Sequence, residues 1–162
     1  MSKLHDEPKY RTFVAVDFDG TCVTHCYPSV GADIGAQDVL RLLVASGFDL
    51  ILYTMRSGKE LKDAVSWFDS NDIPLFGINH NSTQSSWTSS PKVYAHMYID
   101  DAAVGTPLIR PEDGGRAYVD WVEVLSNLIS MYSTIASTLT DFPGLYDKWR
   151  MHVITNYLKA DA

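Results

Sequence analysis

The chain contains 162 residues, of which 46% are hydrophobic and 20% are charged. This length and composition are typical of a globular protein with a sizeable core, so we predict a single domain over residues 1–162. No segment approaches the roughly 20 consecutive apolar residues that a membrane-spanning helix requires. The formal net charge is −7 and Lys and Arg form no stripe, which argues against a long nucleic acid as partner.

The first eight residues lack the hydrophobic core of a signal peptide, which leads us to expect a cytoplasmic protein. In that reducing compartment, Cys22 and Cys26 are expected to be free thiols. His25 lies between them, but two Cys and one His within five residues make a poor tetrahedral metal site, because no second pair of ligands follows.

Strand and helix patterns alternate along the first two thirds of the chain. Apolar runs predict strands at residues 13–16, 48–53, 75–78 and 96–99, with a short edge strand at 106–109. Apolar residues at helical spacing predict one helix over residues 36–43, which ends near Gly47, and another over 61–68. This alternation predicts an α/β fold with a doubly wound parallel sheet.

The last third of the chain reads as helical. One long helical pattern runs from Arg116 to Ala136, and an amphipathic helix over residues 145–158 follows the Pro143–Gly144 break. We therefore predict a core over about residues 11–136 with a C-terminal helical extension. The aromatic residues of the last helix are expected to pack on the domain. A subunit contact is the alternative, which leaves a homo-oligomer open.

The run from Val14 to Thr21 carries the strongest functional signal. Its apolar strand ends in Asp17 and Asp19, followed by Gly20, which allows a sharp turn. Ligands of α/β sheets bind beyond the carboxyl ends of the strands. Two carboxylates there cannot both stay ionised cheaply unless a cation or a proton compensates them. The alternative interpretation is a strand-end turn with two solvated carboxylates.

Two later strands also end in polar residues. Thr54 and Arg56 follow the second predicted strand, and Ser57 with Glu60 fits a capping box that would begin a helix. Thr54 and the free amides of that helix start would bind an anion, and Arg56 would add a cation for a substrate phosphate.

The fourth predicted strand runs into Asp100 and Asp101. Asp100 ends the strand and is expected to bind a metal directly. Asp101 would bind the metal, bind its waters or cap the loop.

These motifs resemble those of the haloacid dehalogenase-like superfamily, most of whose members are Mg²⁺-dependent phosphohydrolases. Asp-Phe-Asp-Gly-Thr at 17–21 is similar to the first motif of that superfamily, Thr54 to the second and Asp100–Asp101 to the fourth. Within the superfamily, the chain is similar to small phage and bacterial hydrolases without a cap domain. Many of these carry Arg or Lys after the final acidic pair. Ala102 and Ala103 stand there in this chain, so that substrate contact would be absent.

The resemblance implies a mechanism. Asp17 would attack phosphorus and form an aspartyl-phosphate, and Asp19 would act as general acid and then as general base. Asp17, the backbone carbonyl of Asp19, and Asp100 would hold Mg²⁺, with Asp101 as a further candidate ligand. The implied reaction is hydrolysis of a phosphate monoester, with a small phosphorylated molecule as the expected substrate.

The superfamily also supplies a lysine upstream of the last acidic strand. Lys92 fits this position, whereas Lys59 and Lys62 belong to the exposed part of a helix pattern. The resemblance therefore implies that Lys92 and Thr54 bind the phosphoryl oxygens.

Neither segment that could hold a cap domain is long enough for one, so we expect an open site. The polar loop over residues 79–91 is the candidate for a mobile flap, in which Trp87 would stack on a substrate or anchor the loop. His25, Tyr27 and Asn79 could line the entrance or serve the structure. An alternative to the phosphohydrolase is a receiver-like or non-catalytic phosphate-binding module.

Overall fold

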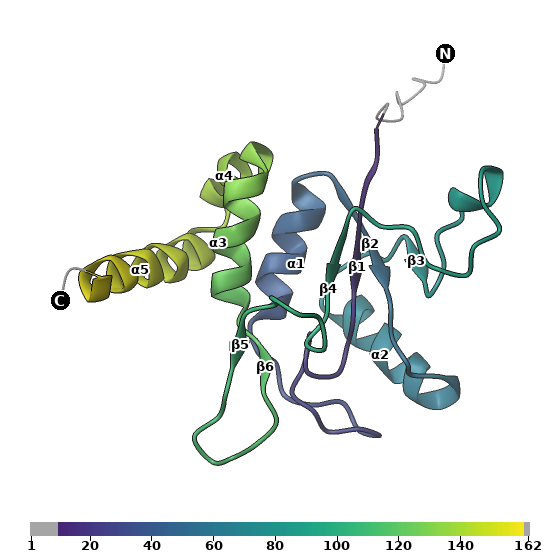
Figure 1. Ribbon diagram of the computed structural model, residues 1–162, viewed down its shortest axis with the longest axis horizontal. Coiled ribbons are helices and arrows are strands. Elements are labelled where there is room, and N and C mark those ends of the chain that lie inside the picture. Colours follow the sequence, from purple (N-terminus) through teal and green to yellow (C-terminus); the bar gives the residue numbers. More distant parts are fainter. Residues whose placement is uncertain (1–9, 161–162) are drawn as a thin grey trace.

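The computed structural model describes residues 10–160 (Figure 1). Its centre is a four-stranded sheet in the order β3-β2-β1-β4, and every neighbouring pair is parallel. The strands are β1 (Thr12–Val16), β2 (Phe48–Leu52), β3 (Gly77–Ile78) and β4 (Met97–Ile99). The predicted α/β fold with a parallel sheet is therefore confirmed, although β3 is only half as long as predicted. The residues on which the signal-peptide expectation rests lie outside the described part of the chain.

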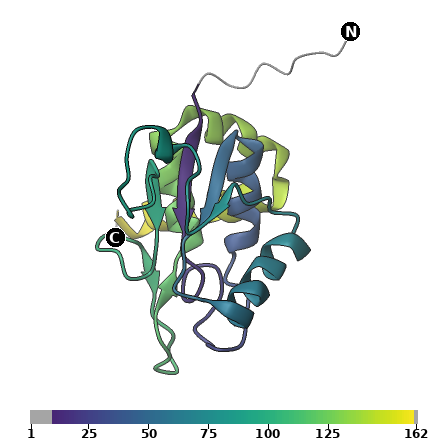
Figure 2. The same cartoon turned by 90° about the vertical axis from the view of Figure 1, so that its right-hand side faces the viewer.

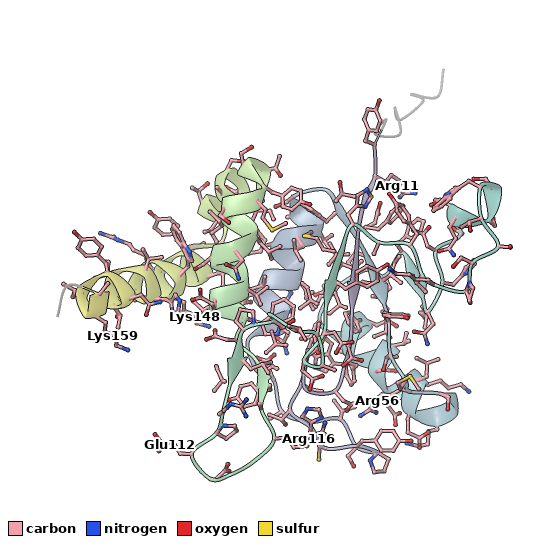
Figure 3. All side chains as sticks on the ribbon, in the orientation of Figure 1. Arg11, Arg56, Glu112, Arg116, Lys148 and Lys159 are labelled. Atoms are coloured by element: carbon pink, nitrogen blue, oxygen red, sulfur yellow. The ribbon has the colours of Figure 1, made fainter. Side chains whose placement is uncertain are left out.

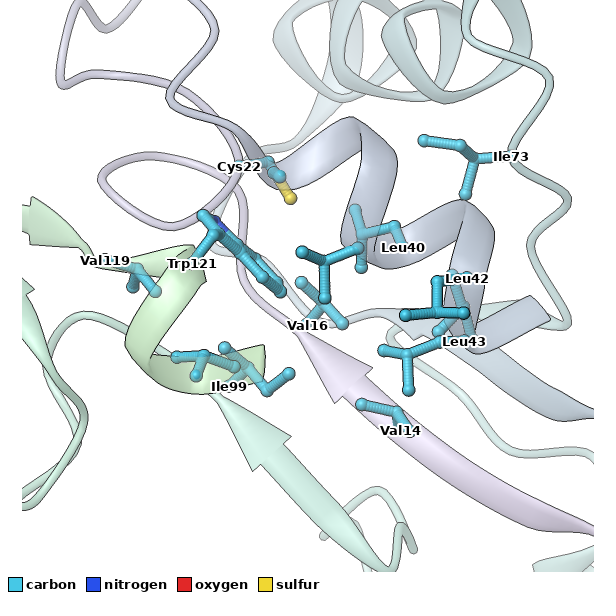
Figure 4. Close-up of a cluster of buried hydrophobic side chains, with 14 of the residues drawn as sticks. Val14, Val16, Cys22, Leu40, Leu42, Leu43, Ile73, Ile99, Val119 and Trp121 are labelled. Carbon is cyan, nitrogen blue, oxygen red and sulfur yellow. The ribbon is translucent and has the colours of Figure 1, made fainter. Parts of the chain in front are cut away.

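Helices cover one face of this sheet. Both helices predicted between the strands form, as α1 (Ala36–Ala45) and α2 (Gly58–Ser70). Alternate residues of β1 and β2, such as Val14 and Leu50, point into one large cluster with α1, α2 and the later helix α3 (Trp121–Met131). Figure 4 shows this packing around Val14, Val16 and Trp121. Parallel strands need such cover, because they are apolar on both faces.

The other face corrects the doubly wound prediction. In the described residues it is covered by the segment over 79–96, which contains only a short turn, η1 (Gln84–Ser86), and no α-helix. Phe13 and Ile51 pack there against Val93 and Tyr94 of that segment. Figure 2 shows it crossing in front of β1 and β4. The segment is rich in Ser, Thr and Asn, and such side chains compete for the backbone hydrogen bonds of a helix.

Asn81 and Gln84 hold this segment together. Both are buried, and their amides bind backbone groups of Tyr94, Ser90 and Lys92. The polar loop is thus tied down by side-chain hydrogen bonds, in place of a helix.

The helical prediction for Arg116 to Ala136 is wrong at its start. Tyr118–Val119 forms strand β6, which pairs antiparallel with β5 (Leu108–Ile109) in a separate two-stranded sheet. Asp120 then begins α3, and its side chain accepts hydrogen bonds from the amides of Val122 and Glu123. The predicted edge strand at 106–109 therefore pairs with β6 and leaves β4 at the edge of the main sheet.

The rest of the C-terminal part is helical, but the single helix predicted up to Ala136 is interrupted at Tyr132, whose backbone is extended with φ −135°. It consists of α4 (Ser133–Thr138), η2 (Leu139–Asp141) and α5 (Pro143–Ala160). In α5, Trp149 packs against the core and donates a hydrogen bond from Nε1 to Ser126 Oγ at 3.1 Å. Tyr157 is 68% exposed, so the prediction that the aromatic residues pack on the domain holds for Trp149 and not for Tyr157. No helix in the described range is both long and apolar enough to span a bilayer.

Trp121 connects this C-terminal part to the turn after β1. Its indole is 2% exposed, and its Nε1–H donates to the carbonyl oxygen of Thr21 at 2.6 Å. Next to it, the amide of Val119 donates to the carbonyl of Gly20 at 2.9 Å. Residues far along the chain, in β6 and at the start of α3, therefore stabilise the turn that carries the acidic motif.

We predict that Trp121→Phe lowers the free energy of unfolding by about 1–3 kcal/mol, because it leaves a buried carbonyl without a donor and opens a cavity. Urea denaturation followed by circular dichroism measures this change. Trp87→Phe is the matched control, since Trp87 is 63% exposed and should change stability by less than about 0.5 kcal/mol. Equal effects of the two changes would contradict the assigned role of Trp121.

Candidate functional site

The register of the sheet brings three of the predicted motifs together. Val16 of β1 is paired with Leu52 on one side and with Ile99 on the other. The ladder continues past the strand ends, where the amide of Asp17 donates to Ile99 O at 3.0 Å and the amide of Tyr53 donates to Val16 O at 2.8 Å. Asp17, Thr54 and Asp100 therefore follow neighbouring strands at one edge of the sheet, as the sequence predicts for a site.

Three of the four predicted acidic residues form a cluster. Asp17, Asp100 and Asp101 each offer a carboxylate oxygen, and these oxygens lie within 4.8 Å of one another. Carboxylate oxygens are the ligands that hard cations such as Mg²⁺ prefer. The donor set therefore fits a divalent cation. The side chain of Asp19 takes no part in this cluster and is bound elsewhere.

The residues after Asp17 hold the nucleophile candidate in place. The Thr21 hydroxyl donates to Asp17 Oδ2 at 3.3 Å and accepts from the amide of Asp101 at 3.0 Å. The Cys22 thiol donates to the carbonyl of Asp17 at 3.2 Å. The Thr21 hydroxyl thus connects Asp17, which follows β1, with Asp101, which follows β4.

Cys22 and Cys26 are both free thiols among the described residues. Burial raises the pKa of the Cys22 thiol well above its usual value, and the nearby charge of Asp17 adds to this effect. The side chains that could hold a metal ion among the described residues are those of Asp17, Asp100 and Asp101, and this group includes neither cysteine. Cys26 is exposed.

The environment of Asp17 raises its pKa from 3.8 to about 7. Burial is the largest cause, and the negative charges of Asp100 and Asp101 act in the same direction. Hydrogen bonds from the Phe18 amide and the Thr21 hydroxyl partly offset this rise. A cation between the carboxylates would remove the repulsion, so this pKa describes the metal-free protein.

Arg56 does not face the cluster, contrary to the phosphate-binding role predicted for it. Its side chain is 1% exposed and forms a bidentate ion pair with Asp19, with both N–O distances at 2.7 Å. The three remaining N–H groups donate to the backbone carbonyls of Pro28, Ser29 and Glu60. Figure 3 shows Arg56 near the end of the strands, beside α2. Because all five donors have partners, no N–H of Arg56 is free for a phosphate in this conformation.

Thr54 is positioned by a residue whose role the sequence left open. The Asn79 side chain accepts from the amide of Thr54 at 2.8 Å and donates to its carbonyl at 2.9 Å. Asn79 has a positive φ of 49°, which Asn tolerates better than most residues. The Thr54 hydroxyl accepts from the amide of Arg56 at 3.2 Å. The predicted capping box is absent here, since Ser57 precedes α2 but its side chain forms no cap hydrogen bond.

Lys92 lies on the sheet face that also carries Asp17. Tyr98 is paired with Ala15, two residues before Asp17, and Lys92 Nζ lies 5.5 Å from the centre of the Tyr98 ring. Lys92 has no ion-pair partner among residues 10–160. Its ammonium group is therefore not paired with a carboxylate, and Lys92 remains a predicted phosphate ligand.

Trp87 borders a hollow beside Lys92. The hollow has a volume of about 370 Å³ and is also lined by Tyr94 and Tyr98. The rings of Trp87 and Tyr94 meet edge to face at 5.3 Å, which fits the anchoring role that the sequence left open for Trp87.

The structure gives His25, whose role the sequence left open, a place beside the acidic cluster. Its Nε2 lies 3.0 Å from Asp101 Oδ2, and both side chains are mostly buried. A single His in a loop without a periodic pattern does not indicate which residue it contacts in the fold. The contact with Asp101 therefore could not be predicted from the sequence.

Comparison with known proteins supplies a relative but no activity. No protein-family model and no curated protein matches the chain significantly. The solved structure of a conserved protein from Bacteroides thetaiotaomicron superposes with a TM-score of 0.62 at 30% sequence identity. The match covers 76% of this chain and 93% of the Bacteroides protein. At this identity and coverage, the chain belongs to the same protein family as that conserved protein.

We predict that the metal-free protein loses stability as the pH rises from about 4 to about 7. Asp17 has a pKa of about 7 when folded, against an ordinary value of 3.8, so the folded state holds a proton in this range that the unfolded state has lost. Stability then falls with rising pH, by roughly a few kcal/mol in total.

Urea denaturation in EDTA at several pH values measures this fall, and Asp17→Asn should remove it. Asp113→Asn, which changes an exposed carboxylate, should keep the wild-type slope. Equal slopes for Asp17→Asn and the wild type would show that Asp17 does not titrate in this range.

Proposed function

We propose that this protein is a Mg²⁺-dependent phosphohydrolase of the haloacid dehalogenase-like superfamily. The observation that carries the proposal is the gathering of Asp17, Asp100 and Asp101 at the end of β1 and β4, with Thr54 at the end of β2. The order of these residues along the chain matches the motifs that the sequence resembles. A cytoplasmic location and a phosphate monoester substrate belong to the same proposal.

Asp17 supplies the nucleophile in this proposal. One of its carboxylate oxygens attacks phosphorus, the bond to the leaving oxygen breaks, and an aspartyl-phosphate forms. Water then cleaves the phosphorus–oxygen bond to Asp17 and releases inorganic phosphate. The hydrogen bonds from Thr21 and Cys22 hold Asp17 before either step. Bound Mg²⁺, held by Asp17, Asp100 and Asp101, would offset negative charge on the phosphoryl oxygens.

Asp19 is the proposed proton carrier of the reaction. It would protonate the leaving oxygen and later take a proton from the attacking water. Both its carboxylate oxygens accept from Arg56 in this conformation, and each oxygen keeps a second lone pair that can carry or accept a proton. Arg56 therefore enters the proposal as the partner of Asp19 and no longer as a phosphate ligand.

Thr54 and Lys92 are the proposed ligands of the phosphoryl oxygens. Thr54 is 8% exposed, Asn79 holds its backbone and the Arg56 amide donates to its hydroxyl, so the hydroxyl needs little reordering on binding. Lys92 would supply the positive charge that Arg56 does not offer. The substrate is proposed to be a small phosphorylated molecule.

We expect Asp17→Asn to lower phosphatase activity by at least roughly 10³-fold while the protein stays folded, since an amide is a far poorer nucleophile. Hydrolysis of p-nitrophenyl phosphate with Mg²⁺ measures this, and Asp113→Asn is the control with wild-type activity. EDTA should abolish wild-type activity and added Mg²⁺ should restore it.

Three outcomes would contradict this prediction. Asp17→Asn activity within a few-fold of wild type would remove the nucleophile assignment. Hydrolysis that persists in EDTA would remove the metal. A single phosphorylation by acetyl phosphate, without turnover of any phosphate ester, would indicate the receiver-like module instead.

We further expect Asp19→Asn to slow the hydrolysis of an alkyl phosphate far more than that of p-nitrophenyl phosphate. An alkoxide leaves poorly without a proton, whereas nitrophenolate leaves unaided. Pre-steady-state rates at saturating Mg²⁺ test this for wild type and variant, provided that phosphorylation of Asp17 limits both reactions. Equal losses on the two substrates would show that Asp19 acts as a scaffold and not as an acid.

A further inference from the structure

His25 touches the acidic cluster from a loop that the sequence motifs do not explain. An ionised carboxylate can only accept hydrogen bonds, so the contact of 3.0 Å is a donation from His25 Nε2–H to Asp101 Oδ2. The backbone amide of Asp101 donates to the Thr21 hydroxyl, which itself donates to Asp17. His25 therefore stands at the outer end of a chain of hydrogen bonds that runs through Asp101 and Thr21 to Asp17.

Gly20 makes room for this contact. It has a positive φ of 81°, and a Cβ there would overlap His25 Nε2 and lie 2.8 Å from Asp101 Oδ2. Any other residue at this position would therefore displace the imidazole, the carboxylate or both. The glycine of the acidic motif serves the turn of the backbone and also the approach of His25 to Asp101.

The loop of His25 has anchors of its own. At its base, Thr24 and Ala32 exchange two hydrogen bonds of 2.9 Å, one through the Thr24 hydroxyl. At its tip, the carbonyls of Pro28 and Ser29 accept from Arg56. These hydrogen bonds hold the loop in place without any contribution from the His25 side chain. The imidazole is therefore not needed to anchor the loop, and its contact with Asp101 requires another explanation.

We propose that His25 is a positioning residue of the cation site, which orients the carboxylate of Asp101 toward the cation. The proposal rests on the proposed function, because it needs a divalent cation at Asp17, Asp100 and Asp101. The hydrogen bond from His25 to Oδ2 fixes the orientation of the Asp101 carboxylate, which therefore loses less freedom when a cation binds. Groups that orient metal ligands in this way typically contribute 10- to 100-fold to metal affinity.

Isothermal titration calorimetry with MgCl₂ alone, at about pH 8, tests the proposal without any assay of activity. His25→Phe keeps a ring but no donor, so its Kd for Mg²⁺ should rise roughly tenfold or more. His25→Gln can place an amide N–H near the position of Nε2, so its Kd should stay within about threefold of wild type. His80→Phe is the matched control at an exposed histidine and should bind as wild type.

A double-mutant cycle separates positioning from a general effect on folding. If His25 acts through Asp101, His25→Phe should not weaken Mg²⁺ binding further in an Asp101→Asn background. A loss of the same size in both backgrounds would overturn the proposal, as would a His25→Phe variant that binds like wild type. The wild type tests the proposed function separately. If it binds no Mg²⁺, the metal site itself is refuted, and the positioning role is refuted with it.

Discussion

The parallel pairing of β1 between β2 and β4 is the constraint on which the rest of the structure depends. The register, in which Val16 lies opposite both Leu52 and Ile99, decides which side chains meet at the edge of the sheet. A shift of one residue in either ladder would turn Asp17 or its neighbours to the opposite face. The strands keep this register because Val14, Val16, Leu50 and Leu52 must all enter the same helix-covered core.

The site that results is electrostatically costly in the absence of a cation. Asp17, Asp100 and Asp101 lie close together and partly buried, and the pKa of Asp17 rises to about 7 as a consequence. Among residues 10–160, no Lys or Arg forms an ion pair with these three carboxylates, and the imidazole of His25 contacts only Asp101. The buried guanidinium of Arg56 neutralises Asp19 instead. A cluster that keeps its negative charge uncompensated retains its affinity for a divalent cation.

The turn after β1 joins all parts of the site. Gly20 admits His25, Thr21 connects Asp17 with Asp101, and Trp121 binds the carbonyl of Thr21 from the start of α3. Strand β6 and the start of α3 therefore contribute to the site, although they place no side chain in the acidic cluster. The C-terminal part of the chain therefore stabilises the turn of the acidic motif, a role that its sequence does not predict.

The sequence by itself determined the parallel α/β fold, the four strands of the main sheet, the short strand β5 and the meeting of Asp17, Thr54 and Asp100 at one edge. These features depend on local periodicity and on the rule that the carboxyl ends of parallel strands lie at the same edge of a sheet. Both can be recognised from the order of residues along the chain. Only the tertiary structure decided the partner of Arg56, the contact of His25 with Asp101 and the hold of Asn79 on Thr54. Each is a side-chain contact across at least 25 residues of chain, whose geometry is set by loops without periodic pattern. The same holds for the second face of the sheet, where buried Asn81 and Gln84 replace a helix.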